Sequence, residues 1–277
     1  MRGLPFPELF EECTVVTNPF AQRPSFEEQS KYLQSSENKE ICKPHILTCE
    51  HLAKVVKECA PELQDLKHKA DQNIVLEEYS TGGEVLHRGF YCPSPIMDVV
   101  TGNCNRGKLL RRVTQRSKPS YKYGFNQDGS LLLVTSFRYD IDAIGIEIIT
   151  RSGEQEIGIS FQEWSGGLQL ERVSECLYQH GRLVSYIDGL YCHSEKYVTS
   201  LKKEEYEYSD AGLTTAHMYS FTNDKVEPLL GHQEYRFKHD EEGYLSQYVA
   251  IEFPNRSGDR KPIWNGHVYG VDIKRKA

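Results

Sequence analysis

The sequence predicts a mainly β protein with a small N-terminal helical segment and an antiparallel meander of repeated hairpins that forms an open curved sheet or a barrel. Two observations lead to this fold class. Apolar residues follow helical spacings in residues 1–72, whereas they alternate from about Ile74 onward. Aromatic and β-branched residues are dense in the later part, and its glycines lie where turns are expected. We therefore expect two domains, a helical segment over 1–72 and a hairpin-repeat domain over 73–277.

The helical segment is expected to contain three helices. Ser25 and Glu28 fit a capping box, in which each residue satisfies a backbone amide of the other, so a first helix should start here. A loose polar connection is expected over 35–43. A second helix should begin near Thr48, where apolar residues recur at spacings of three and four. Pro61 fits the first turn of a third helix, or else a kink.

The clearest strand pair is a hairpin around Ser152 and Gly153. Apolar residues alternate on both sides of this turn: Ile144, Ile146 and Ile148 before it, and Ile157, Ile159 and Phe161 after it. Strict alternation places them on one face of a half-buried strand, so the pattern predicts two antiparallel strands.

A weak internal repeat extends the hairpin pattern along the chain. One or two aromatic residues precede a turn glycine, and an apolar residue and a second strand follow. The turn glycines are Gly83, Gly129, Gly181, Gly212 and Gly243, and the last three are 31 residues apart. Glycine tolerates positive φ in a turn, and the aromatic residues can pair across the strands and fix their register. Successive hairpins of this kind predict a meander.

The pattern aromatic-x-aromatic-x(2–6)-Gly-x-Leu, over about Leu76 to Phe253, resembles the YD repeats of Rhs and teneurin-type proteins. That resemblance implies successive hairpins. The repeat segments lack the tyrosine-aspartate pair and the regular repeat length, so a closed shell is not implied. The chain is also similar, more loosely, to small acidic immunity proteins encoded beside bacterial polymorphic toxins, several of which are β-rich with many aromatic residues. This second similarity implies a protein partner.

Composition describes a globular chain that needs no disulfide or metal to fold. With 277 residues it can bury a sizeable core, and no apolar run approaches the length of a membrane span. The N-terminal residues lack a signal-peptide pattern. We therefore expect a cytoplasmic protein whose eight cysteines are mostly free and buried.

The stretch TGNCNRGKLLRR, residues 101–112, comes close to a phosphate-binding loop. Such a loop needs a strand before it, a helix after it, and a hydroxyl residue after the lysine. Residues 96–100 are expected to supply a strand, but Leu109 occupies the hydroxyl position and the next clear element is a strand near 130–137. The stretch is therefore interpreted as a turn between strands.

The same stretch opens the only strongly basic part of an acidic chain. The net charge is −7, yet residues 101–124 contain seven basic residues and no acidic one. Tyr121, Tyr123 and Phe125 could stack on nucleic-acid bases beside these cations. The acidic remainder of the chain disfavours nucleic acid, and the alternative is a solvated hairpin whose cations face acidic neighbours.

A cluster of thiol and imidazole groups raises the question of a metal. Cys42, His45, Cys49, His51 and Cys59 lie within 18 residues, and these groups are good zinc ligands. The spacing lacks a second ligand pair, and cysteine is common in apolar helix faces. Metal binding by Cys42, His45, Cys49 and Cys59 is left open, and no metal or cofactor is expected.

No catalytic signature emerges. Glu147 and Glu163 could line one sheet face and act as acid and base, but alternation places polar residues on a solvent face anyway.

The leading hypothesis is a non-enzymatic protein-interaction protein, such as an immunity or antitoxin-like protein whose acidic surface meets a basic toxin domain and neutralises it. The alternative is a β-barrel that binds or processes a small molecule in its curved sheet. The candidate binding residues are Arg106, Lys108, Arg111, Arg112, Tyr121 and Tyr123. A protein partner is expected, a small-molecule ligand is possible, and no membrane association is expected.

Overall fold

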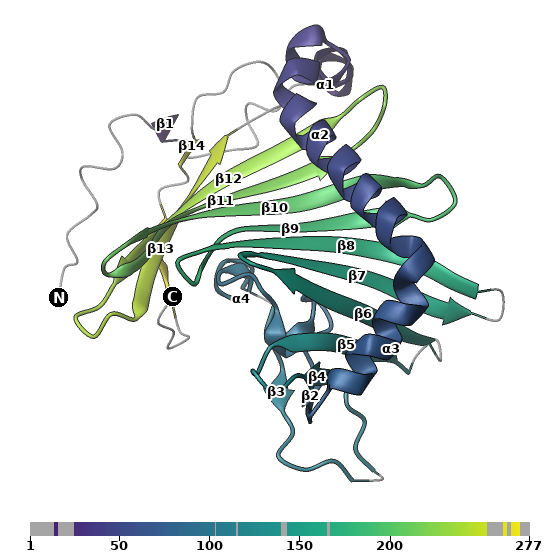
Figure 1. Ribbon diagram of the computed structural model, residues 1–277. Coiled ribbons are helices and arrows are strands. Elements are labelled where there is room, and N and C mark those ends of the chain that lie inside the picture. Colours follow the sequence, from purple (N-terminus) through teal and green to yellow (C-terminus); the bar gives the residue numbers. More distant parts are fainter. Residues whose placement is uncertain are drawn as a thin grey trace. The chain divides into compact units, whose positions relative to one another are not determined.

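The computed structural model describes residues 14–15, 25–102, 104–114, 116–139, 143–164, 167–253, 263–264 and 267–271 (Figure 1). The chain forms two compact units. We call Thr48–Ser200 the central unit, and Met1–Leu47 with Leu201–Ala277 the terminal unit. Helix α2 and strand β10 each run through a boundary between the units, which are described separately. The division into domains at residue 72 stays a prediction.

Helix α1 (Phe26–Leu33) begins at the predicted capping box. The backbone N–H of Glu28 donates to Ser25 Oγ at 3.3 Å, and the N–H of Ser25 donates to the Glu28 carboxylate at 2.8 Å. These two bonds satisfy amides that a helix start leaves without intrahelical partners. The hydrogen bonds from Ser25 also lower the pKa of Glu28.

Helix α2 (Ser36–Cys59) is longer than the sequence analysis predicted, and the polar connection expected over 35–43 is wrong. The helix buries one stripe at spacings of three and four: Asn38, Cys42, His45, Cys49, Leu52 and Val56. Asn38 holds an inward position because its amide donates to the carbonyls of Leu33 and Pro228, at 2.9 and 2.8 Å. The helix continues through Pro44, which removes one backbone hydrogen bond.

The third predicted helix is present as α3 (Leu63–Asn73), preceded by a 3-10 turn (Ala60–Glu62) that contains Pro61. The chain then changes to strands. The central unit contains strands β2 (Leu76–Thr81), β3 (Lys108–Leu109), β4 (Tyr121–Phe125), β5 (Leu131–Arg138), β6 (Ala143–Ser152), β7 (Gln155–Trp164), β8 (Gly167–Gln179) and β9 (Arg182–Cys192). The hydrogen-bonded order is β3-β2-β4-β5-β6-β7-β8-β9, followed by the start of β10 (Tyr197–Ser209).

The terminal unit continues the antiparallel meander from β10. Its strands are β11 (Gly212–Thr222), β12 (Leu229–His239), β13 (Leu245–Phe253), β14 (Ile263–Trp264), β15 (Tyr269–Gly270) and β1 (Thr14–Val15). Strands β10 to β14 follow one another, β15 also pairs with β13, and β1 pairs with β14 in parallel. Among the described strands, the order in each unit does not return to its first strand. The sheet in each unit is therefore open, and the barrel alternative is not formed.

The predicted hairpins are confirmed where strands flank the glycine. In the β6–β7 hairpin Ser152 pairs with Gln155, so the turn lies at Gly153. All five glycines of the repeat have positive φ. Gly129, Gly181 and Gly243 lie in strand-to-strand turns, and Gly212 begins β11 directly after such a turn. The exception is Gly83, which leads out of β2 into a segment without strands.

We call this segment, residues 82–107, the crossing segment; it contains a 3-10 turn (Gly89–Tyr91) and helix α4 (Met97–Val100). The strand expected over 96–100 is therefore wrong. Helices cover the opposite face of the central sheet: His51 of α2 contacts Glu175 of β8 at 3.0 Å. The crossing segment contacts the neighbouring residue Ser174, whose side chain points to the other face. Both faces are covered, so adjacent residues such as Ile148 and Ile149 are both buried.

Candidate functional site

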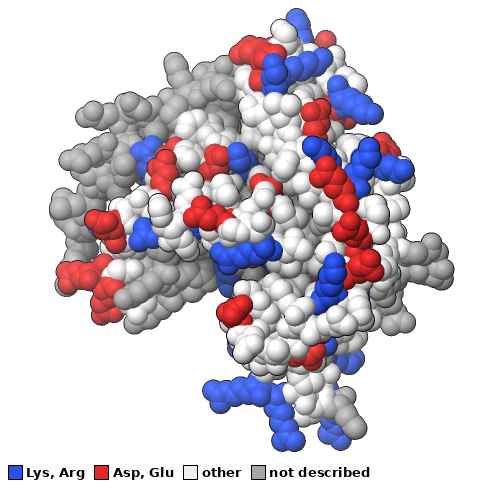
Figure 2. All heavy atoms as spheres, viewed as in Figure 1, with Lys and Arg blue, Asp and Glu red and all other residues white. Residues whose placement is uncertain are grey.

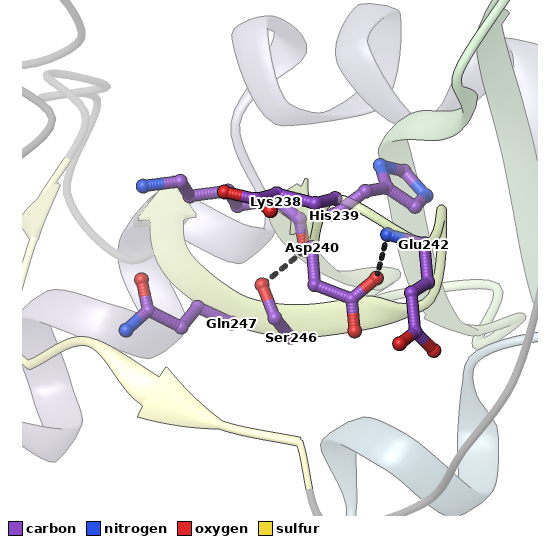
Figure 3. Close-up of a pocket in the computed structure, with 7 residues that line it drawn as sticks. Lys238, His239, Asp240, Glu242, Ser246 and Gln247 are labelled. Atoms are coloured by element: carbon purple, nitrogen blue, oxygen red, sulfur yellow. Dashed lines mark hydrogen bonds between the residues drawn. The ribbon is translucent and has the colours of Figure 1, made fainter.

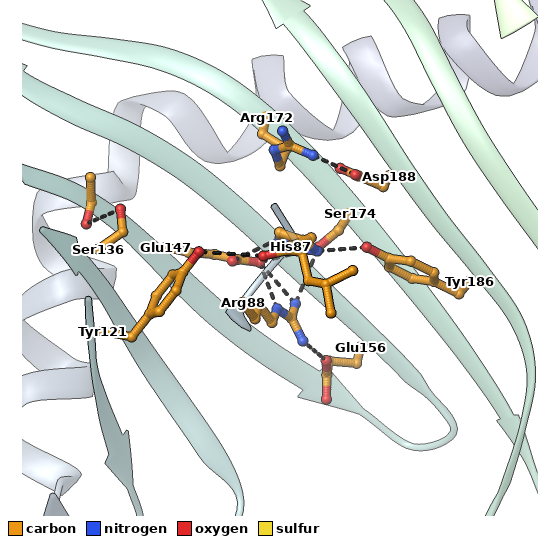
Figure 4. Close-up of polar contacts among 12 residues, drawn as sticks. His87, Arg88, Tyr121, Ser136, Glu147, Glu156, Arg172, Ser174, Tyr186 and Asp188 are labelled. Atoms are coloured by element: carbon orange, nitrogen blue, oxygen red, sulfur yellow. Dashed lines mark hydrogen bonds and ion pairs between the residues drawn. The ribbon is translucent and has the colours of Figure 1, made fainter. Parts of the chain in front are cut away.

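A buried polar network joins the crossing segment to the central sheet (Figure 4). His87 and Arg88 belong to the crossing segment, and Arg88 has a left-handed backbone with φ of 60°. Their partners are Glu147 on β6, Ser174 on β8 and Tyr186 on β9. A non-glycine residue at positive φ is uncommon, and here the surrounding contacts hold it in place.

Every charged group at the centre of this network has a partner. Arg88 Nε donates to Glu147 Oε1 at 2.9 Å, and Arg88 Nη1 donates to Glu156 Oε1 at 2.6 Å. The His87 ring contacts Glu147 Oε2 through Nε2 at 2.9 Å and Tyr186 Oη through Nδ1 at 2.7 Å. The side chains of Arg88 and Glu147 are only 3% and 6% exposed. The network is therefore satisfied inside the protein and closed to solvent.

The charges in this network keep one another ionised. Burial alone would raise the pKa of Glu147, but the charge of Arg88 and the contacts of His87 outweigh it and hold that pKa well below its usual range. Burial alone would lower the pKa of Arg88, but Glu147 and Glu156 raise it well above its usual value. The acid–base hypothesis for Glu147 is therefore not supported, because its carboxylate is paired and inaccessible. The Glu163 side chain lies outside the described residues.

His87 and Arg88 were not singled out from the sequence. Arg88 and Glu147 are 59 residues apart, and their pairing depends on the path of the crossing segment. The only local signal is weak: His87 and Arg88 lie between Gly83 and Gly89, and both glycines have positive φ. Such a segment predicts a loop but not where its side chains will point.

Of the candidate binding residues, Tyr121 and Tyr123 lie in the core of the central unit. Tyr123 Oη donates to the carbonyl of Arg88 and accepts the N–H of Phe90, both at 3.0 Å. Tyr121 Oη donates to the carbonyl of Leu86 at 3.3 Å. The two hydroxyls thus hold the crossing segment against the sheet, and the buried rings cannot stack on a base or a partner.

Arg106 is also engaged internally. Its Nε donates to the buried carboxylate of Asp98 at 3.1 Å, and its other nitrogens donate to the carbonyls of Cys92 and Ser94. Helix α4 precedes residues 101–107 and β3 follows them. The stretch therefore lacks the strand before and the helix after that phosphate binding requires.

The remaining candidates lie on an exposed loop. We call residues 108–118 the basic loop; residue 115 is not described. The loop begins at β3 and extends below β2 and β4 in Figure 1. Its cations are Lys108, Arg111, Arg112, Arg116 and Lys118, all of them exposed. Lys and Arg gather at the corresponding lower end in Figure 2. In the part of the chain that the structure describes, none of these five cations has a carboxylate partner, and Lys118 Nζ lies 5.9 Å from the centre of the Tyr139 ring.

Exposed apolar side chains accompany these cations. Leu109 is 37% exposed and Val113 is 43% exposed, and Tyr139 is also exposed beside Lys118. The basic loop therefore combines unpaired positive charge with apolar surface. Lys122, the last basic residue of the stretch, differs because its Nζ pairs with Glu77 at 2.6 Å.

A depression in the terminal unit lies at the β12–β13 hairpin (Figure 3). It is lined by Lys238, His239, Asp240, Glu241, Glu242, Ser246 and Gln247. Asp240 shapes the turn, since its carboxylate accepts the N–H groups of Glu242 and Tyr244 at 3.0 and 2.8 Å. The depression is open and formed by one hairpin, so it gives the small-molecule alternative no enclosed site.

The thiol and imidazole groups on α2 do not converge. Cys42 Sγ donates to Asn38 Oδ1 at 3.6 Å, and the His45 ring packs 5.1 Å from Tyr219 and 5.6 Å from Phe221. Burial lowers the pKa of His45 to about 4 and raises the pKa of Cys49 to about 12. Among the described residues, no three His, Cys, Asp or Glu side chains form a group that could hold a metal ion.

Comparisons with protein-family models and with curated proteins find no match for this chain. No helix within the described ranges combines the length and the apolar character needed to cross a membrane. The described cysteines are free.

Proposed function

We propose that this chain is a non-enzymatic protein that binds another protein, and that the basic loop is its contact surface. One observation carries the proposal: five exposed cations lie on one loop, without a carboxylate partner among the described residues, in a chain whose net charge is −7. Three buried or partly buried cations of the central unit, Arg88, Arg106 and Lys122, are each paired with a carboxylate. The unpaired cations are therefore the ones available to an acidic surface of a partner.

Protein is favoured over nucleic acid because of the neighbouring side chains. Nucleic-acid binding without sequence readout relies on aromatic stacking beside the cations. Tyr121, Tyr123 and Phe125, which the sequence offers for this role, are buried. Leu109 and Val113 instead present aliphatic surface, which together with arginine is typical of a protein contact.

The looser similarity to immunity proteins suggests the kind of partner. In this version of the proposal the partner is a toxin domain in the same cytoplasm. The charges are the reverse of those expected from the sequence, because an acidic patch of the toxin domain docks on Arg111 and Arg112. The sheet of the central unit would serve as a rigid support for the loop, since the crossing segment and the Arg88 network fix the sheet from which the loop projects.

The experiment is affinity capture with a matched pair of variants. Arg111→Glu with Arg112→Glu reverses two charges on the basic loop, and Lys57→Glu with Lys69→Glu makes the same change in charge on exposed positions of α2 and α3. We expect a protein that the wild type and the helix variant retain and that the loop variant loses. Retention of the same proteins by all three, or turnover by the wild type in hydrolase screens, would contradict the proposal.

A further inference from the structure

The basic loop begins beside an incomplete sheet edge. Strand β3 pairs only with Ser80 and Thr81 of β2, and the N–H of Leu110 still donates to the carbonyl of Tyr79 at 2.8 Å. At Arg111 the chain leaves the edge. Among the described strands, the first half of β2, Leu76–Glu78, therefore has a neighbour on the β4 side only.

The backbone groups on this free edge can be assigned from the pairing. Backbone groups of alternate residues in an antiparallel strand face the same side. Because the carbonyl of Tyr79 faces β3, the N–H and carbonyl of Glu77 face the same, open side. The surroundings are exposed: Val75 is 68% exposed and Leu76 is 52% exposed. An exposed edge of this kind can accept an added strand.

Both carboxylates of this part of β2 have partners inside the protein, since Glu77 pairs with Lys122 and Glu78 accepts the hydroxyl of Tyr91. The basic loop therefore supplies the charge that favours one kind of added strand. A guest that continues the line of β3 along Leu76–Glu78 would lie where Arg111 and Arg112 leave the sheet, and both arginines lack carboxylate partners among the described residues. We propose that the partner contributes an extended acidic segment that adds to β2 as an antiparallel strand, with its carboxylates against the basic loop. This rests on the proposed function and specifies how the partner is held: backbone hydrogen bonds supply the pairing, and the arginines supply the preference for an acidic segment.

The probe is a synthetic peptide of about ten residues that alternates Glu with Val, a pattern that favours an extended strand. The control peptide has the same composition and charge, but its central residues are N-methylated and have no N–H donors. Binding is measured by fluorescence anisotropy, and backbone hydrogen exchange reports protection of the Glu77 N–H, because the N–H of Val75 already donates to the carbonyl of Phe125. We expect the unmethylated peptide to bind at least about tenfold more tightly, with protection of the β2 edge.

Two variants of the protein test the same edge with the peptide left unchanged. Glu77→Pro removes the outward N–H of β2, whereas Glu77→Ala removes the same carboxylate and keeps the N–H; proline is tolerated on the open side of an edge strand. We expect the proline variant to lose affinity for the peptide and the alanine variant to keep it. Circular dichroism and urea unfolding check that both variants fold, and the methylated peptide gives an independent answer if the proline variant does not.

The other outcomes are distinct. Equal binding of both peptides, with equal affinity of the two Glu77 variants, would overturn strand addition and leave the protein-binding proposal standing on charge alone. Binding of single-stranded RNA of matched charge, with no binding of either peptide, would overturn both proposals. A dimer in sedimentation that Glu77→Pro dissociates would make a second copy of the chain the occupant and would overturn the acidic-segment proposal.

Discussion

Arg88 and Arg112 belong to the same compact unit, yet their guanidinium groups meet opposite conditions. Arg88 is 3% exposed and bonds to Glu147, Glu156 and Ser174. Arg112 is exposed and has no carboxylate partner in the described part of the chain. The difference shows how one residue type can have two uses: a charge satisfied internally fixes the path of the chain, whereas a charge left unsatisfied on the surface is available to another molecule.

The largest expected effect comes from Arg88→Met. This change leaves Glu147 buried without its main counter-charge, and breaking a buried ion pair costs about 3–5 kcal/mol of unfolding free energy. Urea unfolding measures it, with Arg112→Met as the matched control, for which we expect a change within about 0.5 kcal/mol. An equal loss of unfolding free energy in the two variants would contradict the proposed difference between the two arginines.

Acid should weaken the protein through the same network. Glu147 stays ionised in the folded state at pH values where an ordinary carboxyl, with a pKa of 4.5, takes up a proton. Its contribution is therefore fully present above that value and is lost as pH falls below it toward the lowered folded pKa. Urea unfolding from about pH 7 to about pH 3 should show this fall. The slope should be shallower in Glu147→Gln; an unchanged slope in that variant would mean that other groups control the acid response.

A smaller effect is expected from Gly158→Ala on β7. A Cβ at this position would overlap Glu147 Oε1 and crowd Arg88 Nη2 and Ser174 Oγ. Overpacking of this kind costs about 1–3 kcal/mol. The matched control is Gly153→Ala: no atom lies within 4 Å of the added Cβ there, but φ of 60° adds backbone strain without touching the network. Only Gly158→Ala should also change how steeply the free energy of unfolding falls with pH. A fall as steep as in the wild type would show that the network accommodates the added methyl group.

The smallest effect on stability should follow from charge reversal in the basic loop. Arg111→Glu with Arg112→Glu changes two exposed side chains that have no described carboxylate partner, so the free energy of unfolding should change by no more than about 0.5 kcal/mol. A larger loss would show that these arginines also support the fold, and would weaken the contrast with Arg88.

Local rules explain what was predictable. The capping box at Ser25, the turn at Gly153 and the change from helix to strand after Asn73 depend on neighbouring residues, and each is present. The start of α2 was missed because Asn38 and Cys42 were interpreted as part of a polar connection. The spacing from Asn38 through Cys42 to Val56 carried the signal, but the hydrogen bonds that make an inward asparagine favourable come from tertiary structure.

The candidate site was predictable only in part. Seven basic residues without an acidic one pointed to residues 101–124, and the exposed loop does lie there. The sequence could not separate Arg106, which pairs with Asp98, from Arg111 and Arg112, because internal partners depend on how the crossing segment folds back. Alternation likewise suggested a solvent face for Glu147, since no periodic pattern shows that a loop covers that face.

The measurement that tests the central claim most directly is a titration of the alternating Glu and Val peptide against three proteins: the wild type, the Arg111→Glu and Arg112→Glu variant, and the Lys57→Glu and Lys69→Glu variant. If the unpaired cations of the basic loop bind an acidic partner, the loop variant should bind at least about tenfold more weakly than the other two, with equal urea midpoints for all three. Equal affinity in all three proteins would contradict the account.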